Sequence, residues 1–508
     1  MRYRLYLIDR YRSLIGYTGV LLAIIGVVFI VPLLTLVFYP QEVRYAPAFL
    51  SAGLPLIIIG MALWYKLAPK QEGSFSPTIH EGMVVVLVVW VVAVTIGAVP
   101  FMLISDLTFT QGAFESISGW TTTGLSVVDV ESAPRVVLLY RSLIQLAGGA
   151  GFAIIALSAL AGPAGAGLSA AEGRGDQLAP HVRHSAAIVL RIYAAYNVIG
   201  IVALRLAGMT WFDAVNHTFT ALATGGFSTR AASIGYFNNP LIEAIVIVLM
   251  LLGALNFLTA YTLFRGNFRA FRRNGEIRLQ VALFLIVIPL LLVLTTASIY
   301  DNIGTSLRVA VFESVSALSG TGFTTVGYAN WNSFGLFILV ILMTIGGGSG
   351  STAGGIKLNR VYVMVKAIRW EWRRAFLPQH TVNEPSIWEG ENRSFISDQL
   401  IRRVTLYVFF YIAMLFIGTA MIAAHGYSIG DSLFEFASSL GTTGLSVGVT
   451  TPDAPPTLLW GMSLGMFLAR LEFFAVMIGV TKLFVDGRVL LTKPETPDRT
   501  VKVREDQA

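Results

Sequence analysis

The chain has 508 residues, of which 55% are hydrophobic and 13% are charged, and its mean hydropathy is +0.70. Soluble domains carry about a quarter charged residues, so this composition excludes a soluble globular protein and indicates many membrane spans. The net charge of +7 does not indicate nucleic-acid binding, because the basic residues lie in short connections between apolar runs, and the absence of cysteine excludes disulfides and thiolate metal sites.

Ten apolar runs are long enough to cross a bilayer. The predicted spans cover residues 13–38, 48–66, 80–104, 136–162, 185–207, 239–264, 279–299, 334–366, 402–424 and 457–485. The first run follows several arginines, but it is too long for the apolar region of a signal peptide, so we expect it to remain as a helix.

Lysines and arginines gather in every second connection between these spans. They include Lys66, Arg183, Arg272, Arg373 and Arg488. Because cytoplasmic loops carry an excess of basic residues, this pattern predicts that both termini lie in the cytoplasm.

Four connections on the other side share a short semi-apolar stretch that ends in a Thr-Gly step. The four segments are Phe114–Gly124, Val215–Gly225, Phe312–Gly322 and Phe434–Gly444. They align without gaps, and their glycines are 101, 97 and 122 residues apart, which is typical of internal repeats. The second position holds Glu115, Glu313 and Glu435, and Asn216 in the second copy. We interpret these glutamates as charges that complement helix N-termini rather than as ion ligands.

The predicted fold is an all-α polytopic membrane protein in which a helix–pore loop–helix unit occurs four times around a central pore. Two extra N-terminal transmembrane helices precede the repeats. The expected divisions are 1–70 for those two helices, 71–175 and 176–275 for pore repeats 1 and 2, 276–395 for pore repeat 3, 396–490 for pore repeat 4 and 491–508 for a cytoplasmic tail.

The Thr-Gly steps point to a cation pore. Non-helical backbone is tolerated at membrane depth only if it is buried in protein or lines a watery cavity. Glycine allows carbonyl oxygens to turn inward, and a ring of carbonyls can replace the hydration shell of a monovalent cation. The candidate filter residues are Thr122, Thr123, Gly124, Ala223, Thr224, Gly225, Gly320, Thr321, Gly322, Thr442, Thr443 and Gly444. The alternative is a set of ordinary loops with turn glycines, which four copies in register disfavour.

Longer motifs surround these steps: Gly-Trp-Thr-Thr-Thr-Gly124, Ala-Thr-Gly225-Gly-Phe-Ser, Ser-Gly-Thr-Gly322-Phe-Thr and Gly-Thr-Thr-Gly444-Leu-Ser. With these motifs, nearly the whole chain resembles the membrane subunit of the Trk potassium-uptake systems, within the Trk/Ktr/HKT superfamily. The two extra N-terminal spans favour the Trk branch. The resemblance implies potassium as the conducted ion, because sodium-preferring plant members have serine where this chain has Gly124.

A glycine-rich segment, 346–357, interrupts the eighth predicted span. Six of its twelve residues are glycine, so the helix should break there. The resemblance places this break below the filter as an intramembrane gating loop, with Gly346, Gly347, Gly348, Gly350, Gly354, Gly355 and Lys357 as gating candidates. A helix-packing patch of small residues and a phosphate-binding loop are the alternatives, and the second lacks the required Gly-Lys-Ser/Thr ending. Lys357 is either a gate cation or a side chain that extends towards the cytoplasm.

Arg470 lies near the middle of the last predicted span, where a charge is costly and usually faces a water cavity or the bundle interior. The resemblance implies that it faces the permeation path as an electrostatic barrier. An ion pair with Glu472 or another buried acid is the alternative. His217, in the second pore helix, is interpreted as a packed or capping residue.

The sequence therefore predicts channel-like potassium uptake, with potassium symport coupled to sodium or protons as the alternative. We find no enzyme motif and no nucleotide site on this chain. The resemblance further implies a prokaryotic cytoplasmic membrane, a homodimer with one pore per protomer, and a cytoplasmic nucleotide-binding regulatory subunit (TrkA-like). Arg369, Arg373 and Arg374 are candidates for its docking face, although they also serve as topology signals.

Overall fold

The computed structural model describes residues 2–68, 77–150, 182–378, 386–389 and 392–492. The second half of the predicted fourth span, 151–162, and the predicted tail beyond residue 492 lie outside this part of the chain.

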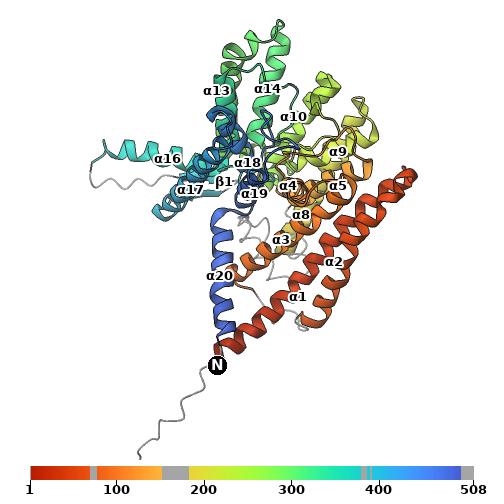
Figure 1. The fold of residues 1–508 in the computed structure, drawn as a ribbon. Helices are drawn as coiled ribbons and strands as arrows, with labels where there is room; N and C mark the ends of the chain where they lie inside the picture. The colour runs from red at the N-terminus through yellow and green to blue at the C-terminus, as the bar shows by residue number, and fades with distance from the viewer. Residues whose placement is uncertain (1, 69–76, 151–181, 379–385, 390–391, 493–508) are drawn as a thin grey trace, which may run out of the picture.

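The two extra N-terminal helices form an antiparallel pair. Helix α1 (Arg2–Ile30) continues as the 3-10 helix η1 (Val31–Val37), and after η2 (Pro40–Tyr45) the chain returns as α2 (Ala46–Leu67). The backbones approach closely because glycines face each other, Gly19 against Gly60 and Gly26 against Gly53, where any Cβ would collide with the facing carbonyl oxygen. Figure 1 shows this pair along one side of the helical body.

Four units follow, and in each a pore helix stands between two flanking helices. They comprise α3 (Ile79–Ile104), α4 (Phe109–Trp120) and α5 (Arg135–Ala150); α8 (Val182–Leu206), α9 (Trp211–Leu222) and α10 (Pro240–Ala254); α13 (Gly275–Leu294), α14 (Ile303–Ser319) and α15 (Ser333–Ile345); and α17 (Asp398–Ala423), α18 (Ile429–Leu440) and α19 (Pro456–Leu471). Each pore helix begins at a polar cap, Thr108, Thr210, Asn302 or Ser428, whose side chain accepts a hydrogen bond from the first turn.

Shorter elements complete the described chain. They are α11 (Phe257–Phe264), α12 (Phe268–Arg273), η3 (Ser233–Phe237), η4 (Thr296–Ser298), α16 (Leu358–Arg374), α20 (Phe473–Leu491) and an antiparallel hairpin of β1 (Ser386–Glu389) and β2 (Asn392–Phe395). Figure 1 shows α16 projecting from the helical body and α20 running down to the start of α1. There, the Tyr11 hydroxyl donates to Asp486 at 2.7 Å.

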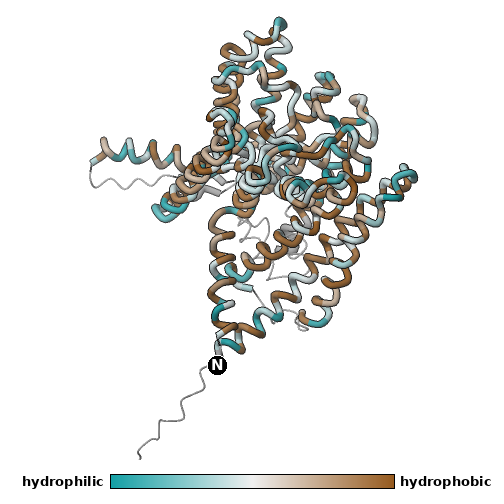
Figure 2. The backbone as a smooth tube through the Cα atoms, viewed as in Figure 1, coloured by the Kyte–Doolittle hydropathy of each residue, from teal (hydrophilic) through white to brown (hydrophobic). Residues whose placement is uncertain are grey.

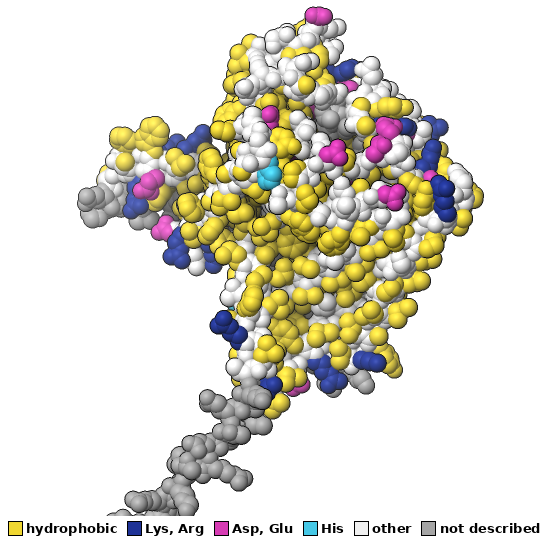
Figure 3. Space-filling view, viewed as in Figure 1, with side chains coloured by type: hydrophobic (Ala, Val, Ile, Leu, Met, Phe, Trp, Pro, Cys, Tyr) yellow, Lys and Arg dark blue, Asp and Glu magenta, His cyan; other side chains and the backbone are white. Residues whose placement is uncertain are grey.

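The surface has the character of a lipid-facing protein. Figure 2 shows apolar stretches along α1, α2 and α3, and Figure 3 shows a broad hydrophobic face between two zones of charged side chains. Six helices of the described residues are long and apolar enough to span a membrane, and they correspond to the predicted spans 1, 2, 3, 5, 7 and 9. The all-α polytopic architecture is therefore confirmed.

Two predicted continuous spans, 239–264 and 457–485, are wrong in detail, because each is broken. Helices α10 and α11 meet at 115°, and α19 and α20 meet at 97°. The first break is stabilised by Asn256, which caps α11. At the second break, Glu472 adopts a φ of 62°, a conformation that no sequence pattern would assign to glutamate. The eighth span breaks at the glycine-rich segment, as predicted, between α15 and α16.

Candidate functional site

The four pore helices end in the interior of the protein, and the chain then turns sharply. In three copies the turn residue is Thr122, Gly320 or Thr442, with φ values of 57°, 66° and 48°. The next residue donates its N–H to the carbonyl five positions earlier. These bonds are Thr123 to Ser118 at 2.8 Å, Thr321 to Ser316 at 3.1 Å and Thr443 to Ser438 at 2.9 Å.

In the second copy the same turn comes one residue later than the gapless alignment predicts. The residue with positive φ is Thr224, at 51°, and Gly225 donates to the Thr220 carbonyl at 2.8 Å. Ala223 is only the C-cap of α9. The predicted alignment of this copy is therefore wrong by one position: Gly226 corresponds to Gly124, and Thr224, Gly225 and Gly226 replace Ala223, Thr224 and Gly225.

The four loops contact one another in cyclic order. A glycine lies two residues after each turn residue, and a Cβ atom on it would collide with a carbonyl oxygen of the next repeat: Gly124 with Gly225, Gly226 with Thr321, Gly322 with Thr443 and Gly444 with Thr123. The four carbonyls occupy equivalent positions in the corrected alignment. Glycine is required at Gly124 both by this approach and by its φ of 97°. The four loops therefore form a closed ring of contacts between backbone atoms of neighbouring repeats.

The glutamates of repeats 1, 3 and 4 do not lie at the N-termini of their pore helices, so the interpretation that they complement helix N-termini is wrong. The pore helices begin earlier than predicted, and Glu115, Glu313 and Glu435 are fully buried in their later turns. Each carboxylate accepts hydrogen bonds from the segment that follows its own turn. For example, Glu115 accepts from Ser126 Oγ and Val127 N, both at 3.0 Å.

The corresponding bonds are made in repeats 3 and 4. Glu313 accepts from Thr325 N at 2.9 Å and from the Tyr328 hydroxyl, and Glu435 accepts from Ser446 Oγ at 2.8 Å and Val447 N at 3.1 Å. A buried carboxylate is costly unless such donors surround it. In repeats 1, 3 and 4 these glutamates thus hold the outer limb of the loop, the segment that follows the glycine, against its pore helix.

His217 occupies this position in the second copy, once the register is corrected. Its Nε2 lies 2.9 Å from Ser228 Oγ, the counterpart of Ser126, and its Nδ1 lies 2.8 Å from the Asp213 carbonyl. Asn216, which the gapless alignment placed opposite the glutamates, instead accepts from Ser142 of α5 at 2.6 Å. The sequence predicts that His217 is a packed or capping residue; the side chain is fully buried, and it also makes the contact that the glutamates make elsewhere.

The glycine-rich loop lies directly beneath the ring. Thr352 is fully buried, and its hydroxyl lies 3.1 Å from the Leu222 carbonyl, 2.9 Å from the Gly253 carbonyl and 3.0 Å from the Thr224 hydroxyl. A Cβ on Gly354 would collide with the Thr442 hydroxyl. The loop therefore touches the pore loops of repeats 2 and 4.

The same loop is held from the side by the broken sixth span and by α13. Gly348 N donates to the Ala254 carbonyl at 2.9 Å, and Ser349 N donates to Glu276 Oε1 at 2.8 Å. The carbonyl groups released where α10 ends thus become acceptors for the loop. Lys357 lies beyond it, with its Nζ 3.7 Å from Glu472 Oε1.

Arg470 extends from the end of α19 to backbone carbonyls on two sides. It donates to Thr352 O at 2.6 Å, and also to Gly148 O and Gly149 O at the end of α5. Glu472 accepts from Arg360 at 2.6 Å and also lies near Lys357. The alternative in which Glu472 is the partner of Arg470 is therefore not the arrangement found.

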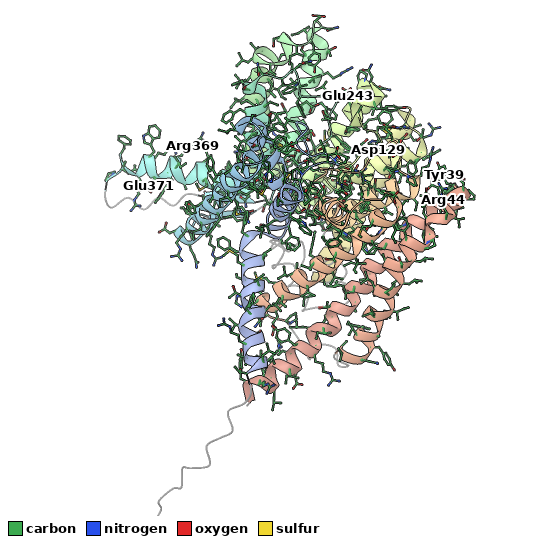
Figure 4. The ribbon with its side chains drawn as sticks, viewed as in Figure 1. Tyr39, Arg44, Asp129, Glu243, Arg369 and Glu371 are labelled. Atoms are coloured by element: carbon green, nitrogen blue, oxygen red, sulfur yellow. The ribbon has the colours of Figure 1, made fainter. Side chains whose placement is uncertain are left out.

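A cavity of about 390 Å³ opens on the other side of the ring. Its lining includes the four glycines that contact the neighbouring repeats, Gly124, Gly226, Gly322 and Gly444. Asp129 stands exposed at its edge (Figure 4). Hydrogen bonds from the Ser132 side chain and the Glu131 N–H lower the pKa of the Asp129 carboxyl. The lining of this vestibule therefore includes a carboxylate at its edge, together with the arginines Arg141 and Arg230.

Two side chains of α5 that sequence reasoning missed also reach this region. Arg141 pairs with Glu115 at 2.8 Å and donates to the Ser228 carbonyl at 3.1 Å, so it connects repeats 1 and 2. Gln145 lies one turn further along α5 and contacts Gly225.

The register error in repeat 2 could have been avoided by aligning the residue after each glycine, because Gly124-Leu, Gly226-Phe, Gly322-Phe and Gly444-Leu match.

The arrangement provides carbonyl oxygens and no carboxylate cage. In the part of the chain that the structure describes, no group of three or more histidine, aspartate or glutamate side chains could hold a metal ion. Backbone carbonyls in a ring suit a weakly hydrated monovalent cation.

Comparison with known proteins agrees with this geometry. A family model described as a cation transport protein, TrkH, matches residues 46–489. An uncharacterized cation transporter of Methanocaldococcus jannaschii is 30% identical over 480 residues, which cover 94% of this chain and 96% of that protein. The Trk system potassium uptake protein TrkH of Salmonella typhimurium is 30% identical over 488 residues, which cover 93% of this chain and 99% of that protein.

The fold also matches a solved structure. The crystal structure of the potassium transporter TrkH from Vibrio parahaemolyticus superposes with a TM-score of 0.80 at 28% identity, and the match covers 94% of this chain and 99% of that one.

Proposed function

Because this chain belongs to the TrkH family of cation transport proteins, we propose that it takes up potassium ions across the cell membrane through the pore formed by its four repeats. The observation that carries the proposal is the cyclic contact of Gly124, Gly226, Gly322 and Gly444 with the carbonyls of neighbouring repeats. A ring of this kind can replace the hydration shell of potassium without a charged ligand. The family consists of transporters, and potassium is the cargo rather than a cofactor.

The filter in this proposal comprises three residues from each repeat. They are Thr122, Thr123 and Gly124; Thr224, Gly225 and Gly226; Gly320, Thr321 and Gly322; and Thr442, Thr443 and Gly444. The vestibule is its outer entrance, where Asp129 attracts cations. Both termini then lie in the cytoplasm, because α1 and α20 meet at the end remote from the vestibule.

The inner barrier is the glycine-rich loop together with Arg470. Thr352 O and Gly148 O each accept a hydrogen bond from the guanidinium, so the charge lies between the loop and α5, below the ring. A fixed positive charge there repels a departing potassium ion. The loop has to move for conduction, and its six glycines at 346–355 make such motion possible.

Relatives named as Trk system proteins support a multicomponent assembly. We assign the regulatory role to a cytoplasmic nucleotide-binding subunit and the functional unit to a homodimer. Helix α16 projects from the body and presents Arg369 on its surface, with Arg373 and Arg374 in its last turn (Figure 4). It supplies a basic docking surface for that subunit.

We divide the chain after residues 70, 175, 275, 395 and 490, as the repeats suggest.

Flux through purified protein in liposomes tests the proposal. Potassium and rubidium uptake, driven by an imposed membrane potential, should exceed sodium uptake and should be absent from empty liposomes. Equal uptake of the three ions, or none, would refute potassium conduction. Replacement of Gly124 by serine should reduce the preference for potassium, because its Cβ would collide with the Gly225 carbonyl.

A further inference from the structure

Gln145 is a fully buried amide on α5 whose two polar atoms both bond to the pore loop of repeat 2. Its Nε2 donates to the Gly225 carbonyl at 2.6 Å, and its Oε1 accepts from Phe227 N at 3.2 Å. The Gly225 carbonyl belongs to the ring, where it faces Gly124. One carbonyl of the ring is therefore held by a side chain from the neighbouring repeat.

This contact explains why the second copy differs from the others. The ring position is Thr123, Thr321 and Thr443 in repeats 1, 3 and 4, but Gly225 in repeat 2. Gly225 does not have a positive φ, so its backbone would accept any L-residue. A Cβ there would instead collide with the Gln145 carboxamide. Glycine stands at this position because Gln145 fills the space of the missing threonine side chain.

Two of the threonines at this position are stabilised by hydrogen bonds within their own repeats, whereas the buried hydroxyl of Thr443 has no hydrogen-bond partner. Thr123 Oγ1 lies 2.8 Å from Thr121 Oγ1, and Thr321 Oγ1 lies 2.7 Å from Ser319 Oγ. Repeat 2 has glycine at this position and therefore no side-chain hydroxyl. Its loop is positioned by hydrogen bonds with Gln145 of α5 instead. Arg141, one helical turn earlier, supports the same loop by donating to Ser228 O at 3.1 Å.

We propose that Gln145 is a positioning residue that sets ion selectivity by fixing the Gly225 carbonyl in the ring. This inference rests on the proposed potassium filter. An amide that donates to the carbonyl oxygen holds that oxygen at one distance from the pore axis. The bond also uses part of the capacity of the oxygen to accept further bonds. Without that bond the Gly225 segment can approach the pore axis and coordinate a smaller ion. Loss of Gln145 should therefore favour sodium relative to potassium.

Permeability ratios of liposome-reconstituted protein test this role. Gln145→Met keeps a buried side chain of similar length but removes both hydrogen bonds. The potassium-to-sodium ratio should fall about fivefold, the factor that corresponds to the loss of one hydrogen bond of ~1 kcal/mol. Ser142→Ala is the matched control, because Ser142 also bonds from α5 to repeat 2, at Asn216, but not to the ring. Its ratio should equal that of the unaltered protein.

A rescue pair tests the spatial argument. Gly225→Thr alone should lose selective conduction, because its Cβ meets Gln145, whereas Gln145→Ala combined with Gly225→Thr should recover most of the potassium preference. An unchanged ratio in Gln145→Met, or normal selectivity in Gly225→Thr alone, would overturn the inference.

If Gln145→Met does not fold, the inference is tested by the double variant, Gln145→Ala combined with Gly225→Thr. A recovered preference supports the inference, and a well-folded double variant without preference overturns it. Failure of the unaltered protein to conduct potassium in the same liposomes would instead refute the proposed function.

Discussion

The guanidinium of Arg470 donates a hydrogen bond to the carbonyl oxygen of Thr352, 2.6 Å away, and thereby joins the end of α19 to the glycine-rich loop. The same guanidinium bonds to Gly148 and Gly149 of α5. A single cation thus ties the loop of repeat 3 to helices of repeats 1 and 4. In the proposed mechanism this tie has to be released before ions pass.

Arg470→Ala should increase potassium flux. The substitution removes both the positive charge below the ring and the bond to Thr352. Arg470→Lys keeps the charge but cannot form the forked set of bonds, so its flux should lie between that of the unaltered protein and that of Arg470→Ala. Rubidium uptake into liposomes measures this order. Unchanged uptake in a correctly folded Arg470→Ala protein would contradict the barrier role.

Thr352→Val should also increase flux, because the hydroxyl that bonds to Leu222, Gly253 and Thr224 is lost while the shape of the side chain is kept. Thr352→Ser, which retains the hydroxyl, is the control and should conduct like the unaltered protein. If both variants conduct alike, the hydroxyl bonds do not hold the loop closed.

His217→Ala should destabilise the outer limb of repeat 2. It removes the hydrogen bonds of the imidazole to Ser228 Oγ and to the Asp213 carbonyl, and each such bond contributes about 1 kcal/mol. The apparent melting temperature in detergent should fall. His217→Gln keeps a hydrogen-bonding group and should lose less. Equal melting temperatures of His217→Ala and the unaltered protein would show that repeat 2 needs no such support.

Asp129→Asn should weaken uptake at low potassium. The carboxylate at the vestibule edge raises the local cation concentration, so its loss raises the half-saturating concentration with little effect on maximal flux. The difference should disappear at high ionic strength.

The pH dependence of this effect is also predicted. Because the pKa of Asp129 lies below its ordinary value, the carboxylate is ionised throughout the range from pH 5.5 to 8, and the effect should be constant there. If the half-saturating potassium concentration of Asp129→Asn remains raised at high ionic strength, Asp129 does not act electrostatically.

Much of this arrangement could be predicted from the sequence. Long apolar runs and basic connections indicated the spans, and the recurrence of Thr-Gly steps indicated the four pore loops. The helix break at 346–357 followed from six glycines in twelve residues. These features are local and depend on composition, so they need no knowledge of contacts.

The remaining features depend on contacts between distant residues. The gapless alignment misassigned repeat 2, because Gly225 and Gly226 are both glycine; the residue that follows Gly226 is the one sequence signal for the correct register, and hydrogen bonding and φ establish it. The break after Ala254 depends on the loop that bonds to its carbonyl. Glu115 had been assigned to a helix N-terminus, but its partners lie eleven and twelve residues further along the chain.

The reversal potential of the reconstituted protein tests the central claim most directly. With unequal potassium on the two sides and equal sodium and pH, we predict a reversal potential near the potassium equilibrium potential. Adding a sodium or proton gradient should leave it nearly unchanged. A reversal potential that moves with the sodium or proton gradient would contradict a potassium-conducting pore and would establish coupled symport instead.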